Sequence, residues 1–237
     1  MTLYGVIIPT YNEVENVQIL CELIKDVFTD MNLHYQIIFV DDGSPDGTAN
    51  LLEELKQKYP IFLIKRFKKL GIGSAYKLAI ETVPNLDFII IMDSDLSHNP
   101  GDIKNFIRKQ KQTNCDLVYG TRYNGGTSVN WPFTRRLLSR IANNLSQIVL
   151  GVDITDFTNS FRLYRGTMLR ALLPIINSTG FSFQMETIYI ASEEGFRIEE
   201  VPVVFHERIR GKSKIGSTEI FLFIKQLLSL PMKRLSS

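Results

Sequence analysis

The stretch IIIMDSDLSHNP, residues 89–100, joins a run of large apolar residues directly to two aspartates that are separated by one serine. With Phe88, the apolar run has the length and composition of a strand that is buried on both faces. A carboxylate is costly to bury without a partner, so Asp93 and Asp95 should either reach water or hold a positive charge. The end of this strand is therefore the first candidate for a functional site.

On both sides of this stretch, apolar runs that predict strands alternate with amphipathic segments that predict helices. The predicted strands are 4–13, 35–42, 61–67, 87–93 and 115–122, and the first four are followed by predicted helices at 17–27, 46–60, 73–83 and 102–112. Such alternation is typical of a mostly parallel sheet that helices cover on both faces. We therefore expect an α/β fold, in which ligands bind at the carboxyl ends of the strands.

After residue 130 the pattern changes to three amphipathic helices and a strand that runs into a basic loop. The helices are predicted at 135–150, 182–195 and 219–230, and the strand with its loop at 196–216. Lys225 interrupts the last helix, which is shorter than the roughly 20 residues that a bilayer-spanning helix needs. Its stripe of apolar residues suits either the core or contact with a membrane or a small membrane subunit, and consists of Ile220, Phe223, Ile224, Leu227 and Leu228.

The composition predicts a single globular domain over residues 1–237, with 44% hydrophobic and 22% charged residues and no linker-like tract. The net charge is only +2, but residues 1–121 have 12 lysines and arginines against 16 aspartates and glutamates, while residues 122–237 have 15 against 9. This asymmetry suggests a metal in one half and an anion in the other, although ordinary surface charge also produces such differences. The small charge and the lack of a stacking platform argue against nucleic-acid binding.

Cysteines and histidines give weaker signals. Cys21 and Cys115 are too few for a disulfide or zinc framework, so we expect both to be reduced. The N-terminus lacks the features of a secretory signal, which favours the cytosolic side of a membrane. His34, His98 and His206 are expected at the surface or in turns, and His98, beside the aspartates, is the one candidate for a functional role.

Two further strand ends have unusual residues. In an extended chain Asp93 and Asp95 point to the same side and can present oxygens to a hard divalent cation, although this short pattern also occurs in turns and helix caps. The segment DDGSPDGT, residues 41–48, is a second acidic turn, in which Asp42 could accept hydrogen bonds from a base or ribose. The segment GIGSA, residues 71–75, lacks the third glycine of a dinucleotide fingerprint, so we do not expect such a cofactor.

Taken together in their order and spacing, the motifs resemble the dolichol-phosphate mannosyltransferases, which are inverting glycosyltransferases with the GT-A fold. These motifs are PTYNEVEN, VDDGSPDGT, KKLGIGSAY, MDSDLSHNP, GTRY, SFRLYR, FQME and RGKSKIG. The resemblance covers nearly the whole chain. It implies transfer of mannose from GDP-mannose to dolichyl phosphate, giving dolichyl β-D-mannosyl phosphate and GDP, with Mg²⁺ or Mn²⁺ as cofactor. A glucosyl version that uses UDP-glucose and a catalytically silent subunit that binds nucleotide sugar or lipid are the alternatives.

The same resemblance implies a location and a set of site residues. It implies the short catalytic form, peripheral on the cytosolic face of the endoplasmic reticulum membrane, where small membrane subunits assist it. Residues 1–121 would bind nucleotide and metal, and residues 122–237 would face acceptor and membrane. The donor site falls on Pro9, Tyr11, Glu13, Val40, Asp42 and Ser94, and the metal falls on Asp93 and Asp95. The donor and acceptor phosphates would be bound by Arg122, Arg208 and Lys214. Further candidates for binding the acceptor phosphate are Arg135, Arg136 and Arg140.

The implied chemistry suits these residue types. A phosphate monoester is mostly dianionic at neutral pH, so the acceptor needs no strong general base. Holding two anions together suits arginine, whose planar fork binds phosphate through two hydrogen bonds. Two positions depart from the expected pattern: Ser97 replaces a glutamine, and Asn159 replaces a glycine. Asparagine at position 159 can still adopt the left-handed conformation that glycine adopts freely.

Overall fold

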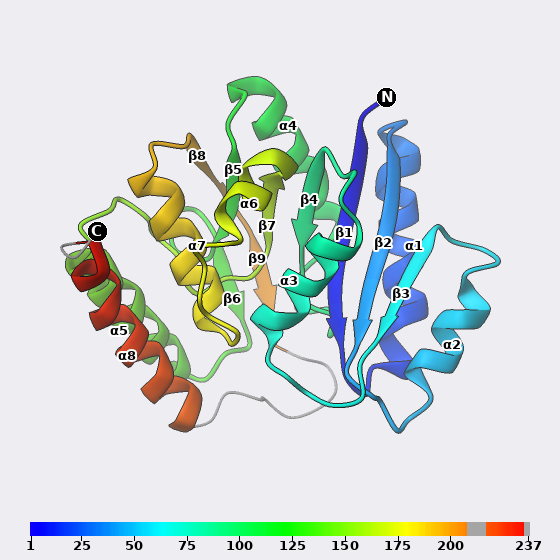
Figure 1. Cartoon of the computed structure of the whole chain (residues 1–237), viewed down its shortest axis with the longest axis horizontal. Coiled ribbons are helices and arrows are strands. Elements are labelled where there is room, and N and C mark those ends of the chain that lie inside the picture. Colours follow the sequence, from blue (N-terminus) through cyan, green and yellow to red (C-terminus); the bar gives the residue numbers. More distant parts are fainter. Residues whose placement is uncertain (208–216, 235–237) are drawn as a thin grey trace.

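The computed structural model describes residues 1–207 and 217–234 of the chain (Figure 1). Seven strands form one sheet in the order β3-β2-β1-β4-β7-β5-β8, in which β7 is antiparallel to its two neighbours and the other pairs are parallel. The strands are β1 (Leu3–Thr10), β2 (His34–Asp41), β3 (Ile61–Lys65), β4 (Phe88–Ile91), β5 (Leu117–Thr121), β7 (Arg162–Arg165) and β8 (Ile198–Pro202). The predicted α/β fold with a mostly parallel sheet is confirmed.

A second, two-stranded sheet lies beside the ends of β5 and β8. It pairs β6 (Thr127–Val129) with β9 (Val204–His206) in parallel. The backbone N–H of Val203 donates to the carbonyl of Thr121 at 3.0 Å, and that of Thr127 donates to the carbonyl of Val203 at 3.0 Å. The small sheet therefore continues the carboxyl edge of the large one.

Helices cover both faces of the large sheet, as Figure 1 shows, and each face has its own apolar core. On one face lie α1 (Val14–Asp30), α2 (Thr48–Leu55) and α4 (Ile103–Thr113), which follows the short helix η1 (Pro100–Asp102). On the other lie α3 (Ile72–Thr82), α5 (Phe133–Leu150), α6 (Gly166–Leu172), α7 (Ser182–Glu193) and α8 (Ser217–Arg234). The free cysteines Cys21 and Cys115 are both buried.

Three local predictions were wrong. The sequence did not predict β7 and α6, because RLYR has a charged residue at each end of a short run. Helix α7 was expected to be amphipathic, but its residues are buried almost all round because α3, α6 and α8 pack against it. Helix α2 ends at Leu55, well before Pro60, because turns that bond back to Leu55 occupy the residues between them.

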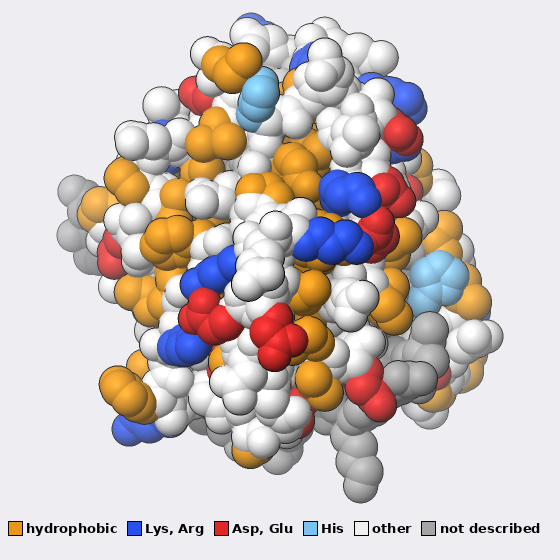
Figure 2. All heavy atoms as spheres, turned by 90° about the vertical axis from the view of Figure 1, so that its right-hand side faces the viewer, with side chains coloured by type: hydrophobic (Ala, Val, Ile, Leu, Met, Phe, Trp, Pro, Cys, Tyr) orange, Lys and Arg blue, Asp and Glu red, His pale blue; other side chains and the backbone are white. Residues whose placement is uncertain are grey.

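The face that has α1 and α2 shows lysines and arginines next to acidic side chains, without a broad patch of one sign (Figure 2). Glu22 accepts hydrogen bonds from Lys25 at 2.6 Å and from Lys58 at 3.1 Å. Glu53 similarly contacts Lys56 at 2.6 Å and Lys65 at 2.9 Å. These acidic side chains are thus paired with lysines of the same half of the chain.

Helices α5 and α8 pack side by side (Figure 1). Both have exposed apolar side chains. In α5 the exposed side chains are Phe133, Leu137, Leu138, Ile141, Leu145 and Ile148, and in α8 they are Leu222, Ile224 and Leu228. Leu227 and Phe223 of α8 instead pack on the core, while the side chain of Ile220 lies outside the described part of the chain. Of the helices described, none combines the length and apolarity that crossing a membrane requires.

Candidate functional site

The strand ends gather the predicted site residues at one edge of the sheet, the lower edge in Figure 1. The parallel register that pairs Thr10 with Asp41 brings the turns after β1 and β2 together. Asp41 is 1% exposed and shapes the second turn by accepting hydrogen bonds from the backbone N–H groups of Gly43 and Ser44 at 3.1 and 3.0 Å. Gly43 has a φ of +73°, which favours glycine at this turn.

The donor-site candidates from β1 line this edge. Pro9 is half-buried at the end of the strand, and Lys69 lies 3.5 Å above the ring of Tyr11. The backbone N–H of Glu13 donates to the hydroxyl of Thr48, and the carboxylate of Glu13 accepts a hydrogen bond from Asn16 at 2.8 Å. The first turn of α1 is therefore fixed against the start of α2, beside the acidic turn.

The two candidates from β2 are held more tightly than expected. Val40 is fully buried, with its side chain in the apolar core, so only its backbone faces polar groups. Asp42 accepts a hydrogen bond from Nε of Arg66 at 2.5 Å, and the same guanidinium donates to Ser74 at 2.6 Å and to the carbonyl of Gly71 at 3.3 Å. Through Arg66, Asp42 thus links the turn after β2 to the glycine segment.

Close packing accounts for the glycines of the GIGSA segment. A Cβ at Gly71 would lie 2.3 Å from the carbonyl oxygen of Thr179, and one at Gly73 would lie 2.9 Å from the backbone carbon of that residue. Gly71 also has a φ of +93°. The backbone N–H of Ser74 donates to the carbonyl of Thr179 at 3.0 Å, so α3 begins directly against this loop.

The two aspartates after β4 have hydroxyl neighbours. Asp93 is partly exposed, and Oδ1 of its carboxylate accepts a hydrogen bond from the hydroxyl of Ser160 at 2.9 Å. Asp95 is 5% exposed, and its Oδ1 accepts from both the hydroxyl and the backbone N–H of Ser97. Ser94, between them, is 6% exposed. Ser97, the departure from the expected glutamine, therefore supports Asp95 directly.

The expectation that His98 lies at the surface was wrong, because the side chain is only 1% exposed. Its ring stacks on Phe161, with centroids 4.9 Å apart, and meets the edge of Phe205 at 5.1 Å. Its Nδ1 lies 3.2 Å from the backbone nitrogen of Asp93, and its Nε2 lies 3.0 Å from Oδ1 of Asn159. The sequence shows no sign of these contacts, apart from the position of His98 beside the aspartates.

Asn159 does not use the left-handed conformation that asparagine tolerates, because its φ is not positive. The side chain, 2% exposed, instead joins three elements. Its Nδ2 donates to the carbonyl of Gly120 at 3.0 Å, while Oδ1 faces His98 and accepts the backbone N–H of Phe161 at 3.1 Å. Asparagine therefore adds polar contacts that glycine would lack.

Arg122 is 8% exposed and forms a paired contact with Asp156, through Nε at 2.7 Å and Nη2 at 2.8 Å. The Nη2 group also donates to the hydroxyl of Thr158 at 2.6 Å. Burial disfavours the charged guanidinium, but the attraction of Asp156 outweighs it and raises the pKa of Arg122. Arg122 is thus a permanent, firmly placed cation at the end of β5.

Further arginines surround an aromatic group next to Arg122. Arg135 lies 4.1 Å above the ring of Trp131, and Arg140 lies 5.6 Å from the ring centre of Tyr123. Arg135 also contacts Glu207 at 3.5 Å. The sequence did not single out Trp131, whose buried indole N–H has no hydrogen-bond partner among the described residues.

Of the three remaining basic candidates, the structure describes only Arg136. Arg136 is exposed and donates to the carbonyl of Ser128 at 3.4 Å. Arg208 and Lys214 lie outside the described residues. The structure thus brings together Arg122, Arg135 and Arg140, here called the arginine group, around the rings of Trp131 and Tyr123.

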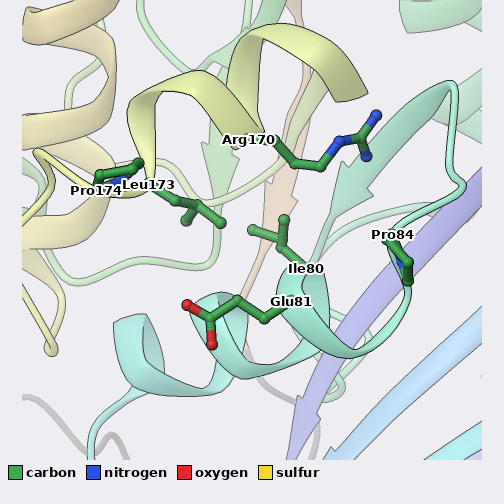
Figure 3. Close-up of a pocket in the computed structure, with 6 residues that line it drawn as sticks. All are labelled: Ile80, Glu81, Pro84, Arg170, Leu173 and Pro174. Atoms are coloured by element: carbon green, nitrogen blue, oxygen red, sulfur yellow. The ribbon is translucent and has the colours of Figure 1, made fainter.

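A separate surface pocket of 490 Å³ lies between the end of α3 and α6 (Figure 3). Its charged groups are Glu81 and Arg170, and the guanidinium of Arg170 donates to the carbonyl of Leu86 at 3.1 Å. Pro84, which precedes β4, lines it as well. This pocket is therefore at the amino edge of the sheet, away from the candidate residues.

The carboxylates suit a hard divalent cation that shares its coordination with a ligand. No group of three or more histidine, cysteine, aspartate or glutamate side chains suitable for a metal occurs within residues 1–207 and 217–234. Mg²⁺ is typically held by one or two carboxylates together with substrate phosphates and waters, which is the donor set that Asp93 and Asp95 could supply. The arrangement therefore fits a metal that binds together with a phosphate ligand.

Solved structures with this architecture include proteins that were crystallised with nucleotide sugars. Glucosyl-3-phosphoglycerate synthase from Mycobacterium tuberculosis, solved with Mn²⁺, UDP-glucose and phosphoglyceric acid, superimposes with a TM-score of 0.70 at 16% identity, over 98% of this chain and 79% of that one. TarS from S. aureus, solved with UDP-GlcNAc, gives 0.65 at 19% identity, over 97% of this chain and 66% of that one. At these identities the likeness shows the fold, which is the GT-A fold of glycosyltransferases.

The sequence defines the family within that class. Residues 5–173 match glycosyl transferase family 2, and the chain belongs to this family. Polyprenol monophosphomannose synthase of Mycolicibacterium smegmatis is 37% identical over 91% of this chain and 82% of its own length. Undecaprenyl-phosphate mannosyltransferase of Micrococcus luteus is 35% identical over 89% of this chain and 86% of its own. The family resemblance found in the motifs is therefore confirmed.

Proposed function

We propose that this protein transfers mannose from GDP-mannose to a polyprenyl phosphate, with inversion, giving polyprenyl β-mannosyl phosphate and GDP. The observation that carries the proposal is the 37% identity, over 91% of the chain, to a protein named polyprenol monophosphomannose synthase. The second relative is also named as a mannosyltransferase, of undecaprenyl phosphate. Dolichyl phosphate, and with it the endoplasmic reticulum membrane, is the narrower acceptor and location that the motifs imply.

The donor would bind at the ends of β1, β2 and β4. Tyr11, Glu13 and Asp42 lie where the nucleotide would be held, and Asp93 with Asp95 would hold Mg²⁺ or Mn²⁺. When bound, the ion supplies positive charge against the pyrophosphate that leaves the sugar. The glucosyl-3-phosphoglycerate synthase structures that contain Mn²⁺ or Mg²⁺ together with UDP support a metal in this fold.

The acceptor phosphate would bind at the arginine group beside the donor. Arg122 is already fixed by Asp156, and Arg135 and Arg140 bring further positive charge to the same end of β5. These cations offset the repulsion between two anionic substrates and orient the phosphate oxygen toward the anomeric carbon. Since that oxygen is already ionised, no residue has to remove a proton from it.

The exposed apolar face of α5 and α8 would contact the membrane that holds the lipid part of the acceptor. The apolar side chains of α5 lie on the same helix as Arg135, Arg136 and Arg140, and α5 has no acidic residue. A basic amphipathic helix of this type binds the surface of an anionic membrane. We place peripheral membrane contact here, with a small membrane subunit as the alternative occupant of the same face.

The test is the transfer of labelled sugar into lipid by the purified protein. We expect GDP-mannose to label undecaprenyl or dolichyl phosphate when Mg²⁺ or Mn²⁺ is present, and EDTA to abolish the transfer. Asp95→Asn should reduce turnover by more than about 100-fold, because it weakens charge stabilisation of the leaving group. The matched control is Asp153→Asn, an exposed carboxylate outside the site.

Each other outcome has a definite meaning. Transfer from UDP-glucose instead of GDP-mannose would replace the proposed donor. Binding of GDP without transfer from either donor, also after addition of membranes, would favour the silent subunit. Comparing the rates of transfer to dolichyl phosphate and to undecaprenyl phosphate decides which of the two is the better acceptor.

A further inference from the structure

We propose that residues 156–160, here called the 156–160 segment, set the position of the Asp93 carboxylate relative to Arg122. Asn159 and His98 act as positioning residues in this role. The proposal rests on the proposed function, since it assumes that Asp93 holds the metal. It assigns His98 a structural task in place of an acid or base role.

The hydrogen bonds of His98 indicate which ring nitrogen accepts and which donates. The backbone N–H of Asp93 can only donate, so Nδ1 of His98, 3.2 Å away, must be the unprotonated ring nitrogen. The proton is then on Nε2, which donates to Oδ1 of Asn159 at 3.0 Å. Because Nδ2 of Asn159 donates to the carbonyl of Gly120, its amide orientation agrees with this assignment. A continuous chain of hydrogen bonds thus joins the end of β5 to the first aspartate.

The two ends of the segment contact the two charges of the site. At one end the hydroxyl of Ser160 donates to the Asp93 carboxylate at 2.9 Å. At the other end Asp156, 0% exposed, binds both Nε and Nη2 of Arg122. A shift of this short segment would therefore displace the carboxylate and the guanidinium together.

A fully buried arginine holds the backbone of the segment in place. Arg162 donates from Nε to the carbonyl of Asn159 at 3.0 Å and from Nη2 to the carbonyl of Phe157 at 2.9 Å. Its third group, Nη1, donates to the carbonyl of Gln184 in α7 at 2.5 Å. The segment is thus tied to β7, to α7 and to both site charges.

Asn159 is the position at which this chain departs from the expected glycine. A glycine there would remove the partner of Nε2 of His98 and one partner of the Gly120 carbonyl, both of which are buried. In this chain the asparagine therefore completes a link between β5 and the aspartates. Its loss should affect metal binding more than the binding of nucleotide.

The experiment measures Mn²⁺ affinity directly. The electron paramagnetic resonance signal of free Mn²⁺ decreases as the ion binds, and it is recorded at a fixed GDP concentration. His98→Gln keeps an N–H near the position of Nε2 but loses the acceptor for Asp93, whereas His98→Asn keeps an acceptor near Nδ1. We expect Asn159→Ala and His98→Gln to weaken Mn²⁺ binding by about 10- to 100-fold. His98→Asn should lose less, because the bond to Asp93 is retained.

A kinetic measurement separates positioning from acid or base catalysis. In the positioning role the Mn²⁺ concentration for half-maximal activity rises in Asn159→Ala and His98→Gln, while kcat at saturating Mn²⁺ stays within a few fold of wild type. An acid or base role would lower kcat equally in both His98 variants at saturating metal. Gln110→Ala is the matched control, since it removes a side chain of similar burial that bonds the carbonyl of Cys115 at 3.3 Å, at the amino edge of the sheet.

The outcomes separate this proposal from the proposed function. If Asn159→Ala and His98→Gln both bind Mn²⁺ as tightly as wild type, the positioning role is overturned and the proposed transferase function stands. A wild-type protein that binds GDP but no Mn²⁺ would overturn the metal role of Asp93 and this proposal with it. If Asn159→Ala does not fold, the comparison of His98→Gln with His98→Asn still decides.

Discussion

At the residue scale, the candidate site depends on charges that the protein itself compensates. Asp156 is fully buried and accepts hydrogen bonds from the backbone N–H groups of Arg122, Thr158 and Asn159 at 3.1 to 3.2 Å, in addition to its pairing with the Arg122 guanidinium. Removing two charges from water costs free energy, and these bonds offset that cost. If one partner is lost, the other is left as an uncompensated buried charge.

Asp156→Asn should therefore be among the most destabilising single changes in the site. We expect it to lower the free energy of unfolding by about 3 to 5 kcal/mol, the usual effect of breaking a buried pair from one side. Urea unfolding followed by circular dichroism measures this. Asp153→Asn, exposed and three residues away, should stay within about 0.5 kcal/mol of wild type. A loss below about 1 kcal/mol in Asp156→Asn would contradict the argument.

The sequence predicted the charged members of the site and missed their supports. Asp93 and Asp95 stand out because carboxylates end an apolar run, and Arg122 stands out at the end of another. Ser160 and Trp131 give no such signal. For His98 the sequence shows only its position beside the aspartates, because its partner Asn159 lies 61 residues away. Periodicity describes what an element buries, but contacts between distant loops appear only after folding.

At the element scale, one carboxylate joins α1 to the chain that follows α2. Glu22 accepts hydrogen bonds from Lys25, Tyr59 and Lys58, and the pKa of its carboxyl is lowered to about 2 by these bonds in that order. The lowered pKa means that folding favours the ionised form. The resulting stabilisation is present above the unfolded pKa near 4.5 and disappears as the pH falls toward 2.

Glu22→Gln should remove this pH-dependent contribution. Above about pH 5 the variant should unfold at a lower temperature than wild type, and the two should converge as the pH falls toward 2. Thermal unfolding at several pH values between 2 and 6 measures the difference. Glu81→Gln serves as a control on α3. A gap between wild type and Glu22→Gln that is constant over this range would contradict the assigned cause.

Element prediction succeeded where burial gives a simple pattern. The strands from β1 to β5 are apolar runs, because helices cover both faces of the sheet, and their predicted positions are close to the observed ones. β7 escaped prediction although it lies inside the sheet, because Arg162 and Arg165 bound it and a buried arginine imitates a surface residue. Helix α7 looks amphipathic in the sequence for a similar reason, since its polar residues Gln184 and Glu186 are buried.

At the scale of the whole molecule, exposed apolar side chains and arginines occur together on α5. Leu137 and Ile141 are 47% and 53% exposed, one turn apart in the same helix as Arg136 and Arg140. Burying such side chains in a bilayer interface is favourable by the hydrophobic effect, and the arginines add attraction to anionic lipid. A lipid tail could then remain in the membrane while its phosphate enters the site.

The double variant Leu137→Ser with Ile141→Ser should bind vesicles that contain phosphatidylglycerol at least about tenfold more weakly than wild type. Sedimentation with the vesicles measures binding, and added salt should weaken it further. Ile19→Ser with Leu23→Ser, two exposed positions of α1, is the matched control. Equal losses of vesicle binding in the two double variants would refute a specific membrane face. Wild-type protein that binds no vesicles but forms a stoichiometric complex with a membrane subunit would refute it as well.

The place of β7 in the sheet has a consequence for the order in which the growing chain can fold. Strands β1 to β4 find their parallel neighbours among themselves, but β5 pairs with β7 and β8, which are synthesised about 40 to 80 residues later. Until then β5 is an open edge that is prone to pair with other chains. Arg122 likewise meets Asp156 only when that part has emerged. The portion that contains β1 to β4 can therefore fold first, and the pairing of Arg122 with Asp156 forms in a later step.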